Sequence, residues 1–90
     1  MTKFQASSIF PIINPLYRLP NVKAATGKSR STIYRNIQAG LFTKPVQIGG
    51  DRVAWPSDEV AAINKARIAG KSDDEIRALV IELEAARNEQ

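Results

Sequence analysis

Four polar side chains that could contact nucleic acid recur at spacings of three or four residues within one short stretch. They are Ser31, Tyr34, Arg35 and Gln38. At about 100° per residue, this spacing places them together on one side of a helix, with Ile33 and Ile37 on the opposite side. Arginine can donate two hydrogen bonds to the O6 and N7 atoms of guanine, and serine and glutamine can bond to base edges. The pattern is typical of a helix that reads the major groove of DNA.

Two short helices joined by a tight corner would position these side chains. The first helix is predicted over residues 22–26 and the second over residues 30–39. Gly27 is expected at the corner, because glycine adopts a positive φ at no steric cost. Ser29 is expected to cap the second helix through its side-chain oxygen. Gly40 is expected to end that helix in the left-handed conformation.

The composition excludes several classes of site. The chain has 90 residues, no cysteine and no histidine, and this length favours one domain with a modest core. Disulfides, thiolate metal sites, zinc sites and nucleophilic triads that use histidine are therefore ruled out. The apolar runs are too short or too interrupted for a membrane span or a signal peptide. We expect a soluble, cytoplasmic protein that is not an enzyme and that needs no metal or cofactor.

Charge is divided unequally along the chain. Residues 1–56 carry eight basic residues against one acidic residue, a net charge of +7, whereas residues 57–90 carry five basic against eight acidic residues, a net charge of −3. A basic region suits a polyanion, whose phosphates supply affinity without regard to sequence. The positive charge is thus concentrated where the predicted helix pair lies, and the acidic part suits packing or a protein contact.

The segment before the helix pair is predicted to be extended. Pro11 and Pro15 forbid a regular helix in residues 1–17, and the apolar residues there indicate an arm that lies on the domain or on a second molecule. A short edge strand is predicted over residues 17–19. Pro20 and Asn21 would then introduce the first helix, with Asn21 as a candidate cap.

Residues 46–55 have the pattern of a β-hairpin. Apolar residues alternate with others on both sides of a glycine-rich turn. The inner face of the hairpin is predicted to hold Val46, Ile48, Val53 and Trp55. The tip would carry Gly49, Gly50 and Arg52.

Two further helices are predicted after the hairpin. Ser57 would cap a helix that ends near residue 69, and Val60 and Ile63 should face the core. Ser72 and Glu75 form the sequence pattern of a capping box, which opens a helix ending near residue 87. The apolar stripe of this last helix consists of Ile76, Leu79, Val80, Leu83 and Ala86. We expect the stripe to fold back on the domain; the alternatives are that it joins two protomers or contacts another protein.

The order of these elements predicts a mainly α-helical winged helix-turn-helix with a small β-hairpin and an added C-terminal helix. We divide the chain into an arm of residues 1–17, a domain of residues 18–70 and an amphipathic helix of residues 71–90. Residues 18–63 resemble the AlpA-type regulators of prophages and genomic islands. The matching pieces are Arg18-Leu19-Pro20, residues 26–35, Ala39-Gly40-Leu41-Phe42, Lys44-Pro45, Gly49-Gly50 and Trp55. The chain departs from the family pattern at Thr43, where proline is usual, and at Asp51.

The resemblance implies a MerR-like winged-helix fold and binding to double-stranded DNA, at an attachment site or an integrase promoter. Members of the family act as transcriptional regulators of integrase genes, as excisionases (recombination directionality factors) or as both, and they are encoded by bacteria or phages. An integrase and self-association along DNA stay open as further partners. The alternative from another class is a protein-interaction module that uses the helix-turn-helix as a scaffold without binding DNA.

The expected DNA contacts fall into three sets. The helix of residues 30–39 would enter the major groove, with contacts from Ser29, Arg30, Ser31, Thr32, Tyr34, Arg35 and Gln38. The wing would contribute Gly49, Gly50 and Arg52, with the arginine in the adjacent minor groove. Lys23 and Lys28 would flank the DNA backbone. The structural alternatives are that Ser29 is only a cap, that Tyr34 covers apolar surface, and that the two glycines only form the turn.

Overall fold

The computed structural model describes residues 15–89 and has the winged helix-turn-helix architecture that the sequence predicts. Residues 1–14 of the predicted arm lie outside the described residues. The elements in chain order are β1 (Leu16–Tyr17), α1 (Leu19–Thr26), α2 (Arg30–Gln38), β2 (Val46–Gly49), β3 (Arg52–Pro56), α3 (Ser57–Ile68), α4 (Asp73–Ala86) and a 3₁₀ turn (Arg87–Glu89). Helices thus dominate, and a small antiparallel sheet accompanies them.

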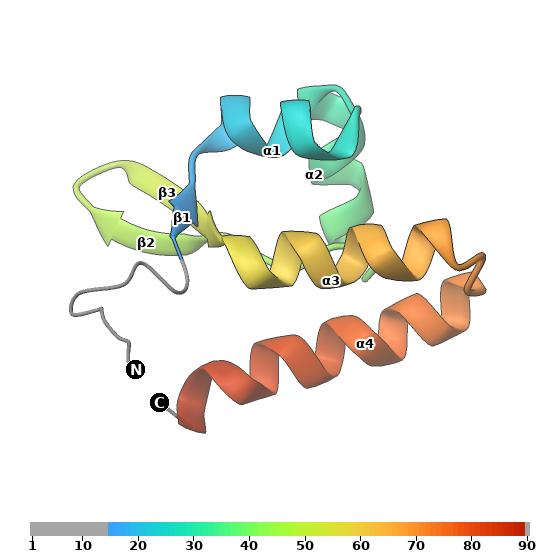
Figure 1. Ribbon diagram of the computed structural model, residues 1–90. Helices are drawn as coiled ribbons and strands as arrows, with labels where there is room; N and C mark the ends of the chain where they lie inside the picture. The colour runs from blue at the N-terminus through green and yellow to red at the C-terminus, as the bar shows by residue number, and fades with distance from the viewer. Residues whose placement is uncertain (1–14, 90) are drawn as a thin grey trace, which may run out of the picture.

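The helices form two levels, with α1 and α2 above the antiparallel pair of α3 and α4 (Figure 1). The hairpin of β2 and β3, here called the wing, extends from one end of the molecule. The strand order is β1-β3-β2, so β3 is the central strand. Within residues 15–89, no helix is long and apolar enough to cross a bilayer.

One hydrophobic core joins the helix pair, the wing and the last two helices. Its buried members are Val22, Ile33, Phe42, Trp55, Val60, Ile63, Ile76 and Val80. Trp55 is fully buried, and its indole N–H donates to the carbonyl oxygen of Thr43 at 2.9 Å. The only tryptophan in the chain therefore fixes β3 to the segment that follows α2.

Helix α1 begins earlier than predicted. It starts at Leu19, three residues before the expected start, and Arg18 takes the position before it. The expected cap, Asn21, lies inside the helix. Pro20 occupies the first turn, where a missing backbone N–H costs no helical hydrogen bond. The edge strand is shifted accordingly to residues Leu16–Tyr17, where Tyr17 pairs with Trp55.

The predicted inner face of the wing is wrong in part. Val46 lies opposite Ala54, and Gln47 lies opposite Val53. Because directly paired residues share a face of a sheet, Val46 shares a face with Ala54 rather than with Val53 and Trp55. An irregularity between Gln47 and Gly49 then shifts the register, and Ile48 is 41% exposed. Alternation along one strand could not reveal this bulge.

The start of α3 also differs from the prediction. Ser57 is the first helical residue rather than the cap, and the preceding Pro56 ends β3. The backbone N–H of Ser57 donates to the carbonyl oxygen of Pro15 at 2.8 Å. Val60 and Ile63 are buried as predicted, so the helix presents the expected face to the core.

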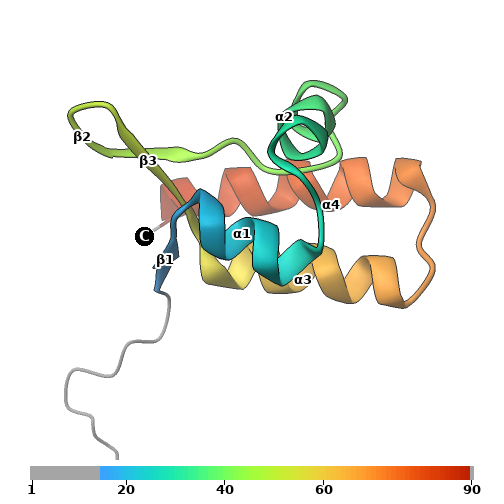
Figure 2. The ribbon, with the colours of Figure 1, turned by 90° about the horizontal axis from the view of Figure 1, so that it is seen from above.

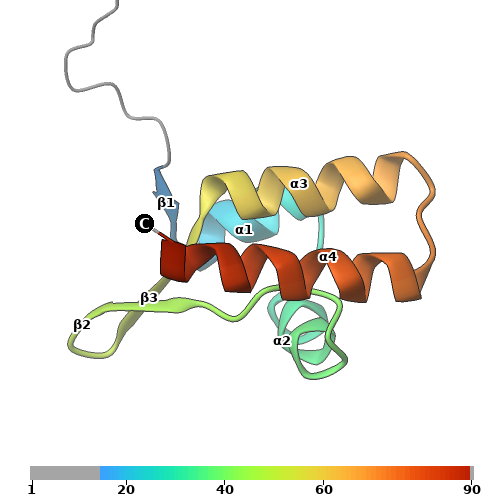
Figure 3. The same ribbon diagram turned by 90° about the horizontal axis from the view of Figure 1, so that it is seen from below.

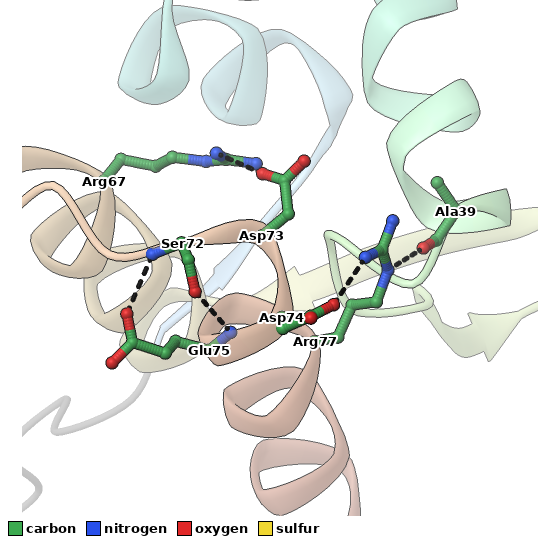
Figure 4. A network of polar contacts seen from close by, with 7 residues as sticks. All are labelled: Ala39, Arg67, Ser72, Asp73, Asp74, Glu75 and Arg77. Carbon is green, nitrogen blue, oxygen red and sulfur yellow. Dashed lines mark hydrogen bonds and ion pairs between the residues drawn. The ribbon is translucent and has the colours of Figure 1, made fainter.

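The capping box of α4 is confirmed (Figure 4). The backbone N–H of Ser72 donates to Glu75 Oε1 at 2.9 Å, and the N–H of Glu75 donates to Ser72 Oγ at 3.2 Å. The hydrogen bond from the Ser72 backbone N–H holds the pKa of Glu75 below its usual value, because it favours the charged carboxylate. The helix therefore begins where the sequence places it.

Helix α4 folds back on α3, as we expected. Ile76 and Val80 are buried in the core, although Ala86, at the end of the predicted stripe, is exposed. Beyond the stripe, Arg87 forms two hydrogen bonds with the buried carboxylate of Glu59, at 2.8 Å from Nε and 2.6 Å from Nη2. These bonds raise the pKa of Arg87 and compensate for the burial of the Glu59 charge.

Thr43 carries a buried hydroxyl that forms no hydrogen bond within the described residues. A buried polar group without a partner costs about 1–3 kcal/mol. We therefore expect Thr43→Val to raise the free energy of unfolding by about 1 kcal/mol in urea denaturation. Thr26→Val is the matched control, because the Thr26 hydroxyl donates to the carbonyl oxygen of Val22 at 2.8 Å. Equal effects of the two substitutions would contradict this interpretation.

Candidate nucleic-acid interface

A tight corner sets the angle between α1 and α2. Gly27 has φ 71°, as predicted, and its backbone N–H donates to the carbonyl oxygen of Lys23 at 2.8 Å. Asn64 on α3 donates its side-chain amide to the carbonyl oxygen of Ala25 at 2.9 Å. The end of α1 is therefore held both by its own last turn and by α3, which leaves α2 in a defined direction.

Helix α2 has the expected two sides, with one exception. Ile33 is 1% exposed, whereas Ser31, Arg35 and Gln38 are exposed to solvent. Tyr34 was expected on the exposed side, with coverage of apolar surface as the alternative; it is half-buried, and its ring packs edge-on against Trp55 with 6.2 Å between ring centroids. At about 100° per residue, Tyr34 lies only about 60° around the helix from Ile37, so it falls at the boundary of the buried side.

Both arginines of α2 are exposed, and neither forms an ion pair with a carboxylate of the described residues. The guanidinium carbon of Arg30 lies 5.1 Å from the centroid of the Tyr34 ring, within the range of a cation–π contact. Arg35 donates from Nη2 to Thr32 Oγ1 at 3.3 Å. Neighbouring side chains thus orient both cations without neutralising their charge.

Ser29 caps α2, as predicted. Its Oγ accepts from the backbone N–H of Thr32 at 3.3 Å. The same hydroxyl lies 3.1 Å from Thr32 Oγ1 and 3.4 Å from Ser31 Oγ. Three hydroxyls therefore gather at the exposed start of the helix, the end of a helix that favours an anion.

The wing tip lies on the same side of the molecule as α2, with α3 on the far side (Figures 2 and 3). Gly49 and Gly50 have φ 125° and 56°, a region that side chains disfavour. The side-chain amide of Gln47 donates to the carbonyl oxygen of Gly50 and closes the turn. Arg52 is exposed just after it. The tip therefore combines a compact backbone with one exposed cation.

Two lysines flank α2 on the side of α1. Lys23 is exposed in the last turn of α1, and Lys28 is half-buried in the corner. Burial and the nearby charge of Arg67 lower the pKa of Lys28, because both disfavour its protonated form. A phosphate placed beside Lys28 would act in the opposite direction and stabilise its charge.

Two charged residues of α4 bind the ends of the segment between α2 and the wing, and no motif in the sequence predicts this role. Arg77 of α4 donates from Nε to the carbonyl oxygen of Ala39 at 2.9 Å (Figure 4). Glu84 of the same helix accepts from the backbone N–H of Lys44 at 2.8 Å. Charged residues beside the apolar stripe of a helix normally face solvent. The sequence near Arg77 and Glu84 therefore gives no indication of these contacts.

Comparison with known proteins was consistent with this architecture. The sequence model of a family described as "Prophage CP4-57 regulatory protein (AlpA)" matches residues 16–66, which is more than half of the chain. A relative from Enterobacteria phage P4, "Uncharacterized protein ORF88", is 48% identical over 54 residues, which cover 60% of this chain and 61% of the relative. The chain thus spans less than two thirds of that relative's length. No solved structure matches significantly.

The cap of α2 provides a test of the local structure that presents this surface. Loss of a serine cap typically costs about 1 kcal/mol, so Ser29→Ala should lower the free energy of unfolding by about that amount in urea denaturation. Ser31→Ala is the control, since it removes a hydroxyl of the same kind from an exposed position within the helix. Indistinguishable losses in the two variants would show that Ser29 does not act as a cap.

Proposed function

Because the chain belongs to the AlpA family of prophage regulatory proteins, we propose that it binds double-stranded DNA in a sequence-specific manner and regulates an integrase gene, directs excision, or does both. The observation that carries this proposal is the exposed side of α2. It presents Arg35 beside Ser31 and Gln38 and opposite the buried Ile33, with Arg30 exposed at the start of the helix. Neither arginine forms an ion pair within residues 15–89.

In the proposed complex, α2 lies in the major groove. Arg35 donates to guanine O6 and N7. Its hydrogen bond with Thr32 already restrains the Arg35 side chain, so less conformational freedom is lost on binding. Ser31 and Gln38 contact a base edge or a phosphate. Tyr34 acts as a platform that holds Arg30, because its ring is already engaged with Arg30 on one side and with Trp55 on another.

The hydroxyls and backbone N–H groups at the start of α2 would bind the phosphate backbone. Such contacts fix the position of the protein on the duplex without reading the sequence. Lys23 and Lys28 would contact phosphates beside the same helix end. Binding by these groups should release counterions, so the affinity should fall as salt is raised.

The wing would bind beside α2. Arg52 would reach into the adjacent minor groove, where narrow A·T segments attract arginine, and Gly49 and Gly50 would let the backbone approach closely. The location of the wing tip on the same side as α2 (Figure 2) supports simultaneous contact by both elements. The net charge of −3 in residues 57–90 makes α3 and α4 a poor second surface for DNA.

The regulatory and recombination roles use the same binding surface. As a regulator, the protein would occupy the promoter of an integrase gene. As an excisionase, it would occupy an attachment site, bend the DNA and steer an integrase toward excision, with the integrase performing all the chemistry. Self-association along DNA would follow if several sites lie side by side.

The test is binding of Arg35→Ala to duplexes from the attachment region and from the integrase promoter of the chain's own element, at several salt concentrations. Loss of a base-reading arginine should cost about 1–3 kcal/mol of binding free energy and relax specificity at one base pair. The measurement is a titration by fluorescence anisotropy, with Lys65→Ala as the control. Lys65 is an exposed cation of α3, the helix that lies on the far side of the molecule from α2 (Figure 3).

The outcomes of this titration test the role of the protein, the role of Arg35 and DNA binding itself. Preference for the attachment region favours excision, and preference for the promoter favours gene regulation. If Arg35→Ala and Lys65→Ala weaken binding equally, Arg35 does not read a base. If the unmodified chain fails to bind any duplex at low salt, the protein-interaction alternative replaces DNA binding.

A further inference from the structure

Helix α4 contacts both ends of the connection between α2 and the wing. At one end, Arg77 donates to the carbonyl oxygen of Ala39, directly after α2, at 2.9 Å (Figure 4). At the other end, Glu84 accepts from the N–H of Lys44 at 2.8 Å, and Arg87 Nη2 donates to the carbonyl oxygen of Lys44 at 2.6 Å. Both backbone groups of the residue before Pro45 are thus bound to α4 or to the turn that follows it.

These contacts are themselves held by the rest of the fold. Asp74 accepts from Arg77 Nη1 at 3.1 Å, and the buried Glu59 of α3 accepts twice from Arg87. Arginine has five N–H donors in a fixed planar arrangement, which lets Arg87 bind Glu59 and Lys44 together. The Arg87 contact is therefore anchored in the buried Glu59 of α3, whereas Arg77 and Asp74 form an exposed pair within α4.

The family match supplies a second observation. It ends at residue 66, whereas α4 begins at Asp73. The helix-turn-helix and the wing lie inside the matched region, but the residues that join them to α4 come from beyond it. The segment that connects α2 to the wing is thus held by a part of the chain that the family match does not cover.

We propose that α4 and the turn that follows it form a positioning element, which sets the angle between α2 and the wing through Arg77, Glu84 and Arg87. This inference rests on the proposed DNA binding only for its functional consequence. Two elements that must bind adjacent grooves together bind more tightly when their relative position is fixed beforehand, because less freedom is lost on binding. Arg77, Glu84 and Arg87 are positioning residues in this scheme and need not touch DNA.

The geometry can be tested without DNA. Because the chain has no cysteine, Ser31→Cys on α2 and Asp51→Cys at the wing tip provide two unique sites for spin labels, both exposed. Pulsed electron paramagnetic resonance should give a narrow distribution of distances between the two labels in the labelled parent and a broader one after Glu84→Ala. Glu84→Gln should restore the narrow distribution, because its amide oxygen can still accept from Lys44. Glu82→Ala, which removes an exposed carboxylate from the same helix, should leave it unchanged.

A second substitution keeps this test decisive if Glu84→Ala fails to fold. Arg77→Met removes the contact with Ala39 at an exposed position of α4 and should also broaden the distribution. Distributions identical to the parent in every folded variant would overturn the proposal. This result would stand whether or not the chain binds DNA.

The functional consequence is measured on the unlabelled full chain. With the duplex that the parent binds best, Glu84→Ala and Arg77→Met should bind about threefold to tenfold more weakly, and Glu84→Gln should bind like the parent. Parent-like affinity in both disrupted variants would overturn the positioning role in binding. If the parent binds no duplex, the proposed function fails, and the distance measurement alone still decides whether α4 fixes the wing.

Discussion

Burial of Ile33 and Trp55 in one core is the constraint on which the rest of the structure depends. Helix α2 has nine residues, too few for an isolated helix to be stable in water. Burial of a side chain such as Ile33 contributes about 1.5–3 kcal/mol, so α2 exists because its apolar side is covered. Trp55 brings β3, the strand of the wing that is central in the sheet, into the same core, and the exposed sides of both elements are positioned as a result.

Hydrogen bonds from α4 add to the core in fixing the segment between α2 and the wing. The core fixes where α2 and β3 pass, but the backbone groups of the segment between them lie outside the core and can bind either water or a side chain. Helix α4 supplies such side chains at Ala39 and Lys44. Arg77 and Glu84 are thus placed by contacts with residues distant in the sequence, whereas Arg30 and Arg35 form no ion pair within residues 15–89.

Local chemistry made much of the fold predictable. Gly27, Gly40 and Gly70 all have positive φ where a helix was expected to stop, because few other residues accept that backbone conformation. The Ser29 cap and the capping box at Ser72 likewise depend only on residues three positions apart. The predicted burial of Trp55 was also correct, since a large aromatic in an alternating strand is normally part of a core.

What sequence analysis could not provide depends on contacts between distant residues. The bulge after Gln47 changes which residues share a face of the wing, and no residue type in this segment predicts it. Arg77 and Ala39 are 38 positions apart, and a single sequence does not show that they meet. Tyr34 lies at the edge of the buried side of α2, where helical periodicity is ambiguous. The assignment of particular side chains to DNA contacts stays a prediction, because it concerns a partner as well as the chain.

The most direct measurement is a map of backbone amide chemical shifts in the ¹⁵N-labelled full chain during titration with a duplex from the attachment region of its own element. If the exposed side of α2 enters the groove and the wing binds beside it, the largest shifts will fall at residues 29–38 and 49–52, with little change along the exposed side of α3. Large shifts confined to α3 and α4, with residues 29–38 unchanged, would contradict the proposed interface.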